Sequence, residues 1–183
     1  HTNHTEQLID VVQNKEGGLS CFILKSTPHD YLGALNTSLT PQNTPILVKN
    51  IFQGLSAIHN HGIIHKSIDF HKILIDMETL SSQFVDFENA DYFSPLFPPN
   101  EQIEQNIKNK PEPEVFGTLG YTAPEALLSH DQYHYAVDVW STGIVLAQYI
   151  FPEIPQFQIQ PEFHKSESDY IAQLVGSDEL LHT

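Results

Sequence analysis

Apolar residues recur at helical spacing in the region that follows Thr44. One face of the predicted helix carries Leu47, Val48, Ile51, Phe52, Leu55 and Ile58. Thr44 and Pro45 fit the N-cap and the first helical position, and Gly62 fits the end of the helix. We therefore expect an amphipathic helix that begins at Thr44, stops at Gly62 and buries one side.

A second helical pattern, between Tyr135 and Phe151, is apolar around its whole circumference. Its apolar residues include Val137, Trp140, Ile144, Val145 and Tyr149. A helix of this kind belongs at the centre of a domain, and Pro152 predicts where it ends. Shorter helices are expected at residues 29–36 and 168–175.

Shorter apolar runs predict strands. These strands are residues 8–12, 19–24, 73–75 and 83–85. The first two flank Gly17 and Gly18, which can supply the positive φ angles of a hairpin turn. The last two are joined by residues 77–82.

Charge and composition narrow the class of protein. The 183 residues carry 8 basic and 23 acidic side chains, a net charge of −15, which disfavours a nucleic-acid or anionic-membrane surface. The single cysteine, Cys21, rules out an internal disulfide and favours an intracellular setting, nuclear or cytoplasmic, over secretion. No apolar run approaches the roughly 18 residues of a membrane helix, so no membrane insertion is expected.

Residues 94–115 hold five prolines and little periodicity, which predicts a flexible insertion.

Residues 62–76 read G-I-I-H-K-S-I-D-F-H-K-I-L-I-D. This stretch resembles the catalytic loop of a protein kinase, H-R-D-L-x-x-x-N followed by a short apolar strand, with His65 in the histidine position. Three chemical positions differ from that pattern. Ser67 stands where the catalytic Asp belongs, Asp69 where a phosphate-binding Lys is usual, and Lys72 where the metal-binding Asn belongs.

Further kinase signatures follow in the order that the family requires. Residues 85–88 read V-D-F-E and match the D-F-G segment, with Glu in place of Gly. Residues 117–125 read G-T-L-G-Y-T-A-P-E, and residues 138–143 read D-V-W-S-T-G. The chain thus resembles the mostly helical C-terminal lobe of a eukaryotic protein kinase, preceded by a remnant of the N-lobe sheet. This resemblance implies an α+β, protein-kinase-like fold. It is most similar to the cell-division-cycle-seven kinases, with casein kinase two a close second.

The resemblance implies four segments. Residues 1–28 would form the last N-lobe strands and the hinge, and residues 29–93 the first half of the C-lobe, with the catalytic-loop and D-F-G equivalents. Residues 94–115 would be an insertion in the activation segment. Residues 116–183 would hold the A-P-E segment, the central helix and part of the end of the lobe. A Gly-rich loop, a V-A-I-K lysine and the last helices of the lobe would have to lie outside this chain.

The positions that build the core of a kinase are present. The resemblance implies that His65 packs on Phe87 and that Asp138 holds the backbone of the catalytic loop. The remaining structural positions are Glu125, of the A-P-E segment, and Trp140. The hinge and nucleotide-pocket positions are Leu24, Lys25, Thr27, Leu74 and Asp86, and Asp86 is also the candidate metal ligand.

The positions that handle phosphate are changed. Asp69 in place of a Lys would repel the γ-phosphate by roughly 4 kcal/mol at about 4 Å and an effective dielectric near 20. Ser67 cannot accept a proton as a carboxylate would, which forfeits a factor of about 10²–10⁴ in rate. Lys72 puts an ammonium where a second Mg²⁺ would need an oxygen ligand.

We therefore interpret the chain as a catalytically inactive kinase-like domain, a pseudokinase that binds or scaffolds other protein subunits. No cofactor is expected, and ATP with Mg²⁺ would bind only if residual affinity survives. Two alternatives stay open. One is a serine/threonine kinase whose N-lobe lies outside this chain, and the other is a regulator that binds nucleotide without transferring phosphate.

The resemblance also predicts how the emptied site is held together. Asp69 and Asp86 would converge at the former phosphate site, where two bare carboxylates repel each other. We hypothesise that the Lys72 ammonium bridges Asp86, and Asp69 as well, in place of a metal ion; the alternative is that Lys72 points to solvent. A zinc site is disfavoured because the local histidines lack a zinc-ligand spacing. These histidines are His59, His61, His65 and His71.

Overall fold

The computed structural model describes residues 5, 7–12, 21–25, 29–34, 39–92, 117–118, 120–128 and 134–153. The chain divides into two compact units. Unit 1 comprises His1–Ile58 and Phe70–Asp86, and unit 2 comprises His59–Asp69 and Phe87–Thr183. The predicted hairpin turn, the insertion at 94–115 and the helix at 168–175 lie outside the described residues.

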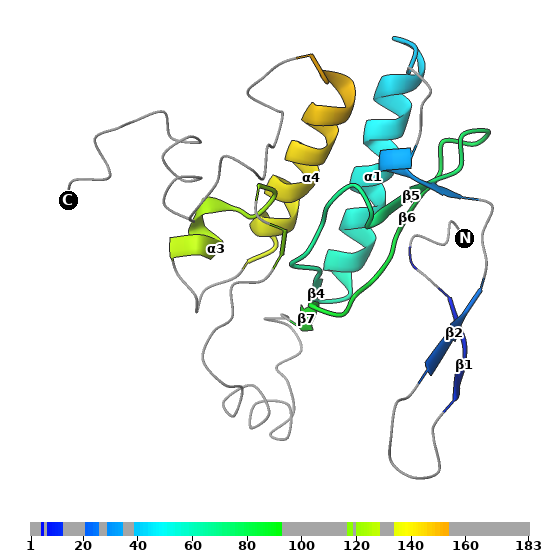
Figure 1. The fold of residues 1–183 in the computed structure, drawn as a ribbon, viewed down its shortest axis with the longest axis vertical. Helices are drawn as coiled ribbons and strands as arrows, with labels where there is room; N and C mark the ends of the chain where they lie inside the picture. The colour runs from blue at the N-terminus through cyan, green and yellow to red at the C-terminus, as the bar shows by residue number, and fades with distance from the viewer. Residues whose placement is uncertain are drawn as a thin grey trace. The chain divides into compact units, whose positions relative to one another are not determined.

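Unit 1 begins with the predicted hairpin strands. Strand β1 (Leu8–Val12) pairs antiparallel with β2 (Cys21–Leu24), in a register that sets Leu8 opposite Leu24 and has an irregularity before Asp10 (Figure 1). Lys25 continues the pairing, because its N–H donates to the Gln7 carbonyl at 2.8 Å. Several large apolar side chains of this hairpin are exposed, namely Leu8, Ile9, Ile23 and Leu24.

A three-stranded antiparallel sheet follows in the order β3-β5-β6. Its strands are β3 (Asp30–Tyr31), β5 (Ile73–Ile75) and β6 (Ser82–Phe84). The prediction of a helix over 29–36 is wrong for its described part: Asp30 and Tyr31 pair with Ile75 and Leu74, and only Leu32–Ala34 form a 3-10 turn. The local pattern could not reveal this strand, since its partner lies more than 40 residues away and pairing outweighs local propensity.

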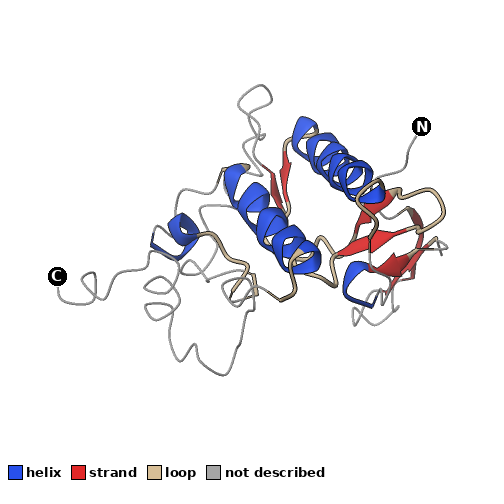
Figure 2. Cartoon of the chain, turned by 90° about the horizontal axis from the view of Figure 1, so that it is seen from above, coloured by secondary structure: helices blue, strands red, loops and turns tan. Residues whose placement is uncertain are grey.

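Helix α1 (Asn43–Asn60) lies beside this sheet, as Figures 1 and 2 show. The predicted apolar stripe is confirmed, and its fully buried members are Leu47, Ile51, Leu55 and Ile58. The predicted N-cap is wrong by one turn, because the N–H groups of Asn43 and Thr44 both donate to the Thr40 carbonyl at 3.0 Å. Gly62 ends the helix as predicted: it takes φ +77°, and its N–H donates to the His59 carbonyl.

Unit 2 holds the short pair β4 (Ile63–Ile64) and β7 (Asp91–Tyr92), the helix α3 (Pro124–Leu128) and the helix α4 (Ala136–Ile150). Ile64, Ala123, Ala126 and Val137 form a buried apolar cluster, against which Tyr135 and Trp140 pack. Within the described ranges, no helix combines the length and the apolarity needed to cross a membrane.

Helix α4 differs in one respect from its prediction. It is not buried all round, because the Val139 side chain is 46% exposed. Its buried side instead includes the polar residues Asp138, Ser141 and Thr142. The hydroxyl of Ser141 donates to the Tyr121 carbonyl at 2.7 Å. Polar groups inside a domain need such partners, and Asp138 and Ser141 on this side of α4 hold loop backbone of unit 2.

Candidate functional site

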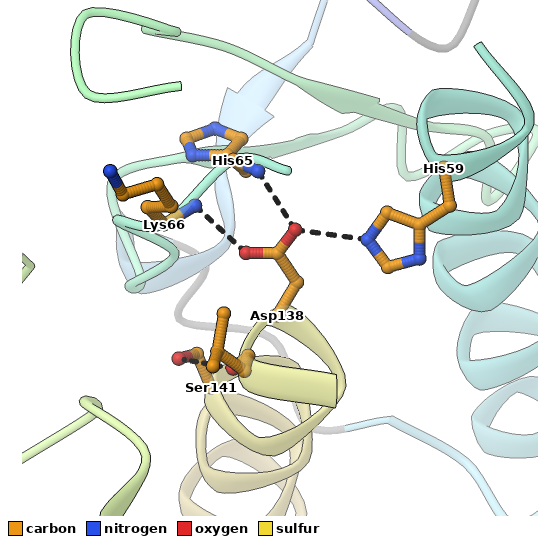
Figure 3. Close-up of polar contacts among 6 residues, drawn as sticks. His59, His65, Lys66, Asp138 and Ser141 are labelled. Carbon is orange, nitrogen blue, oxygen red and sulfur yellow. Dashed lines mark hydrogen bonds and ion pairs between the residues drawn. The ribbon is translucent and has the colours of Figure 1, made fainter. Parts of the chain in front are cut away.

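The Asp138 carboxylate, in the first turn of α4, is the centre of the candidate site in unit 2. Its side chain is fully buried, and it accepts three hydrogen bonds (Figure 3). The backbone N–H groups of His65 and Lys66 donate to it, each at 2.8 Å, and His59 Nε2 donates at 2.9 Å. One carboxylate thus fixes two successive peptides of the catalytic-loop equivalent and the end of helix α1.

The His65 side chain contacts Phe87, as the resemblance implied. The two ring centroids are 4.7 Å apart and the rings are tilted by 37°. His59, which also binds Asp138, lies against the Tyr135 ring with a centroid distance of 4.7 Å. Aromatic contacts at these distances stabilise a buried loop, so the kept residues of the motif form a connected frame.

Lys66 is a site residue that the sequence analysis missed. The Lys66 side chain is only 3% exposed, and its ammonium lies 3.5 Å from the Asp91 carboxylate on β7. Its backbone is in the left-handed region, with φ +68°, which costs a non-glycine residue free energy and is seen mostly where a loop has a special role. One signal in the sequence could have identified it: Lys66 directly follows His65 and so occupies the Arg position of the H-R-D motif.

Ser67 and Asp69 both lie buried in unit 2. The Asp69 carboxylate accepts a hydrogen bond from the Thr118 hydroxyl at 2.8 Å. Thr118 follows Gly117, whose φ of +99° favours glycine and where a Cβ would make a tight contact, 3.0 Å from the Lys66 carbonyl oxygen. The segment that opens with Gly117 is therefore fastened directly to the changed catalytic loop, a link that the sequence analysis did not identify.

Lys72 and Asp86 meet in unit 1, where the Lys72 ammonium forms an ion pair with the Asp86 carboxylate. The two residues are aligned by the β5–β6 pairing, which continues through a hydrogen bond from Val85 N–H to the Lys72 carbonyl at 3.1 Å. Asp86 also has a positive φ, +62°. The structure thus brings together two of the residues that the sequence analysis assigned to the phosphate end of the site. Asp69 belongs to the other unit, so its predicted convergence with Asp86 stays a prediction.

The turn between β5 and β6 carries a further ordered carboxylate. Asp76 accepts hydrogen bonds from the Thr79 hydroxyl at 2.8 Å and from the Glu78 N–H at 2.9 Å. The Thr79 hydrogen bond, assisted by the Glu78 N–H, lowers the pKa of Asp76 below its usual value. This turn stabilises the end of strand β5, which begins at Ile73, directly after Lys72.

The other predicted site residues are placed as follows. Leu24 and Lys25 are exposed at the end of β2, Leu74 is half-buried in β5, and Thr27 lies outside the described residues. Glu125 is exposed on α3, and Trp140 is half-buried on α4, where it packs against the apolar cluster of unit 2. None of these placements by itself assigns a ligand.

A divalent metal ion does not fit the residues around Asp86. Mg²⁺ binds oxygen ligands, and the motif would need one from residue 72. The ammonium of Lys72 has no lone pair to offer a metal ion, and its charge repels one. Across the described ranges, no three His, Cys, Asp or Glu side chains are grouped so that they could hold a metal ion.

The comparison with protein families gives a match over most of the sequence. A family model described as the protein kinase domain matches residues 5–179, nearly the whole chain. The matched span includes the catalytic-loop equivalent, the D-F-G equivalent and the segment that ends in Glu125.

Proposed function

This chain belongs to the protein kinase domain family, and within that family we propose that it is a pseudokinase, which binds other protein subunits and transfers no phosphate. The proposal draws on a division among its residues. Contacts that hold the fold together are kept, as between Asp138 and the loop backbone. Groups that would act on phosphate are replaced, at Ser67, Asp69 and Lys72.

The observation that supports this proposal most is the ion pair between Lys72 and Asp86. In an active kinase the equivalent Asp binds the metal ion that neutralises the phosphates. Here that carboxylate is already paired with a cation from its own chain. Phosphoryl transfer depends on positioning and charge neutralisation, so a site whose metal-binding Asp is paired with a lysine in place of the second ligand has lost the main source of catalysis.

Asp69 supports the same conclusion. Its buried carboxylate accepts the Thr118 hydroxyl hydrogen bond, so a negative charge is fixed where the family places a Lys. The position adds repulsion for phosphate instead of attraction. Ser67 adds no general base, because a hydroxyl does not take up a proton near neutral pH.

The finer assignment within the family rests on sequence alone. We propose that the chain is nearest to the branch of the cell-division-cycle-seven kinases and casein kinase two. Its net charge of −15 argues for protein partners over nucleic acid. The exposed apolar side chains of the β1–β2 hairpin would suit a neighbouring protein surface.

Phosphotransfer with labelled ATP tests the proposal directly. We expect the chain, with Mg²⁺ or with Mn²⁺ and generic protein substrates, to incorporate no more label than its Ser67→Ala variant. Incorporation well above background that Ser67→Ala abolishes would contradict the proposal and favour a working serine/threonine kinase. Stabilisation of the chain by ATP, without any transfer, would favour the nucleotide-binding regulator instead.

A further inference from the structure

The β5–β6 pairing brings Lys72 close to Asp86, the residue that follows Val85. Strands β5 and β6 pair antiparallel with Ile73 opposite Phe84. The next hydrogen bond in that ladder runs from Val85 N–H to the Lys72 carbonyl at 3.1 Å. Ile73, Phe84 and Val85 are buried, so the point where the two charged side chains leave the sheet is anchored in the core of unit 1.

The environment of the pair favours a lasting contact over a loose surface one. The Lys72 side chain is only 15% exposed, whereas the Asp86 side chain is 41% exposed. Asp86 holds a left-handed backbone conformation, with φ +62°, which a non-glycine residue keeps when its surroundings fix it. Ion pairs that are partly withdrawn from water are less screened than exposed ones.

We propose that the Lys72 ammonium is a built-in cation that takes the place of a divalent metal ion at Asp86, so that this carboxylate binds neither Mg²⁺ nor Mn²⁺. The inference deepens the proposed pseudokinase function and rests on it. A metal ion at Asp86 would have to displace the ammonium or lie beside it. Both are unfavourable, because the largely buried Lys72 ammonium would lose its carboxylate partner in the first case and two cations would be in contact in the second.

If the Lys72 ammonium excludes a metal ion from Asp86, a substitution at position 72 should restore a metal site. In Lys72→Asn the ammonium is removed, and residue 72 gains an amide oxygen, which Mg²⁺ and Mn²⁺ accept as a ligand. Lys72→Met removes the charge without adding a ligand. Lys72→Arg keeps the charge. The three variants therefore separate the effect of the cation from the effect of a new ligand.

Titration with Mn²⁺, followed by electron paramagnetic resonance of the free ion, tests the inference without any catalytic readout. We expect parent, Lys72→Arg and the control Lys49→Asn, an exposed lysine on α1, to show the same weak background binding. Lys72→Asn should bind Mn²⁺ at least about tenfold more tightly, and the double variant Lys72→Asn/Asp86→Asn should lose that gain. Lys72→Met should fall between parent and Lys72→Asn. Equal Mn²⁺ affinity in parent and Lys72→Asn would overturn the inference.

A second comparison does not depend on the folding of any Lys72 variant. If parent binds Mn²⁺ and Asp86→Asn removes that binding, Asp86 is a metal ligand and the inference is wrong; if the two proteins bind alike, it is supported. This result is separate from that of the phosphotransfer assay. A chain that transfers phosphate would refute the proposed function, whereas Mn²⁺ bound through Asp86 without transfer would refute only the role given to Lys72.

Discussion

Replacement of Asp138 by Asn is the most informative test of the frame that holds the catalytic-loop equivalent. The carboxylate is fully buried and accepts hydrogen bonds from the His65 and Lys66 N–H groups and from His59 Nε2. An amide of the same shape has one accepting oxygen and presents an NH₂ group to the remaining donors. At least one buried backbone N–H is then left without an acceptor, at about 1–3 kcal/mol.

The charge adds to this loss. Removal of one partner from a buried charged network costs about 3–5 kcal/mol in all. For a chain of this size each kcal/mol lowers the melting temperature by about 2–4 °C, so Asp138→Asn should melt roughly 6–20 °C below parent. The assay is thermal unfolding followed by near-ultraviolet circular dichroism near neutral pH.

A matched control for this change is Asp30→Asn, because Asp30 is an exposed residue of β3. Its free energy of unfolding should stay within about 0.5 kcal/mol of parent. A melting temperature for Asp138→Asn within about 3 °C of parent would refute the reasoning, because the three hydrogen bonds would then carry little stability.

Two further substitutions test local features. Gly117→Ala should cost about 1–3 kcal/mol in urea unfolding, because φ is +99° and the new Cβ would lie 3.0 Å from the Lys66 carbonyl oxygen. Gly143→Ala should be neutral or stabilising by up to about 1 kcal/mol, because among the described residues no atom outside the local helix backbone lies within 4 Å of the added Cβ; equal costs for the two would contradict the steric argument. Asp76→Asn should make the stability of the fold less sensitive to acid. The pKa of Asp76 is lower in the folded state than its unfolded value near 3.8, so its ionised form stabilises the fold above that value. This stabilisation is lost as the pH falls through the folded pKa. Unfolding curves recorded between about pH 5 and about pH 3 check this, and identical acid sensitivity of parent and variant would refute it.

The sequence by itself predicted the elements whose signal is local. The spacing of Leu47, Ile51 and Leu55 predicted the buried face of α1, and Gly62 predicted its end. Hydrophobic periodicity survives in any tertiary context, because a helix must bury one side. The order of the motifs was also sufficient to predict the kinase domain, since each motif combines several residues at fixed separations.

Tertiary structure decided the features that depend on distant partners. Strand β3 exists because Asp30 and Tyr31 pair with β5, and two residues are too few to show the alternation of a strand in the sequence. Val139 is exposed on an apolar helix, whereas Asp138 is buried, because unit 2 places loop peptides against that face of α4. The sequence predicted which residues had changed at the phosphate end. The role of Lys72 in the fold became visible only in the tertiary structure, where β5 pairs with β6 and the Lys72 ammonium forms an ion pair with the Asp86 carboxylate.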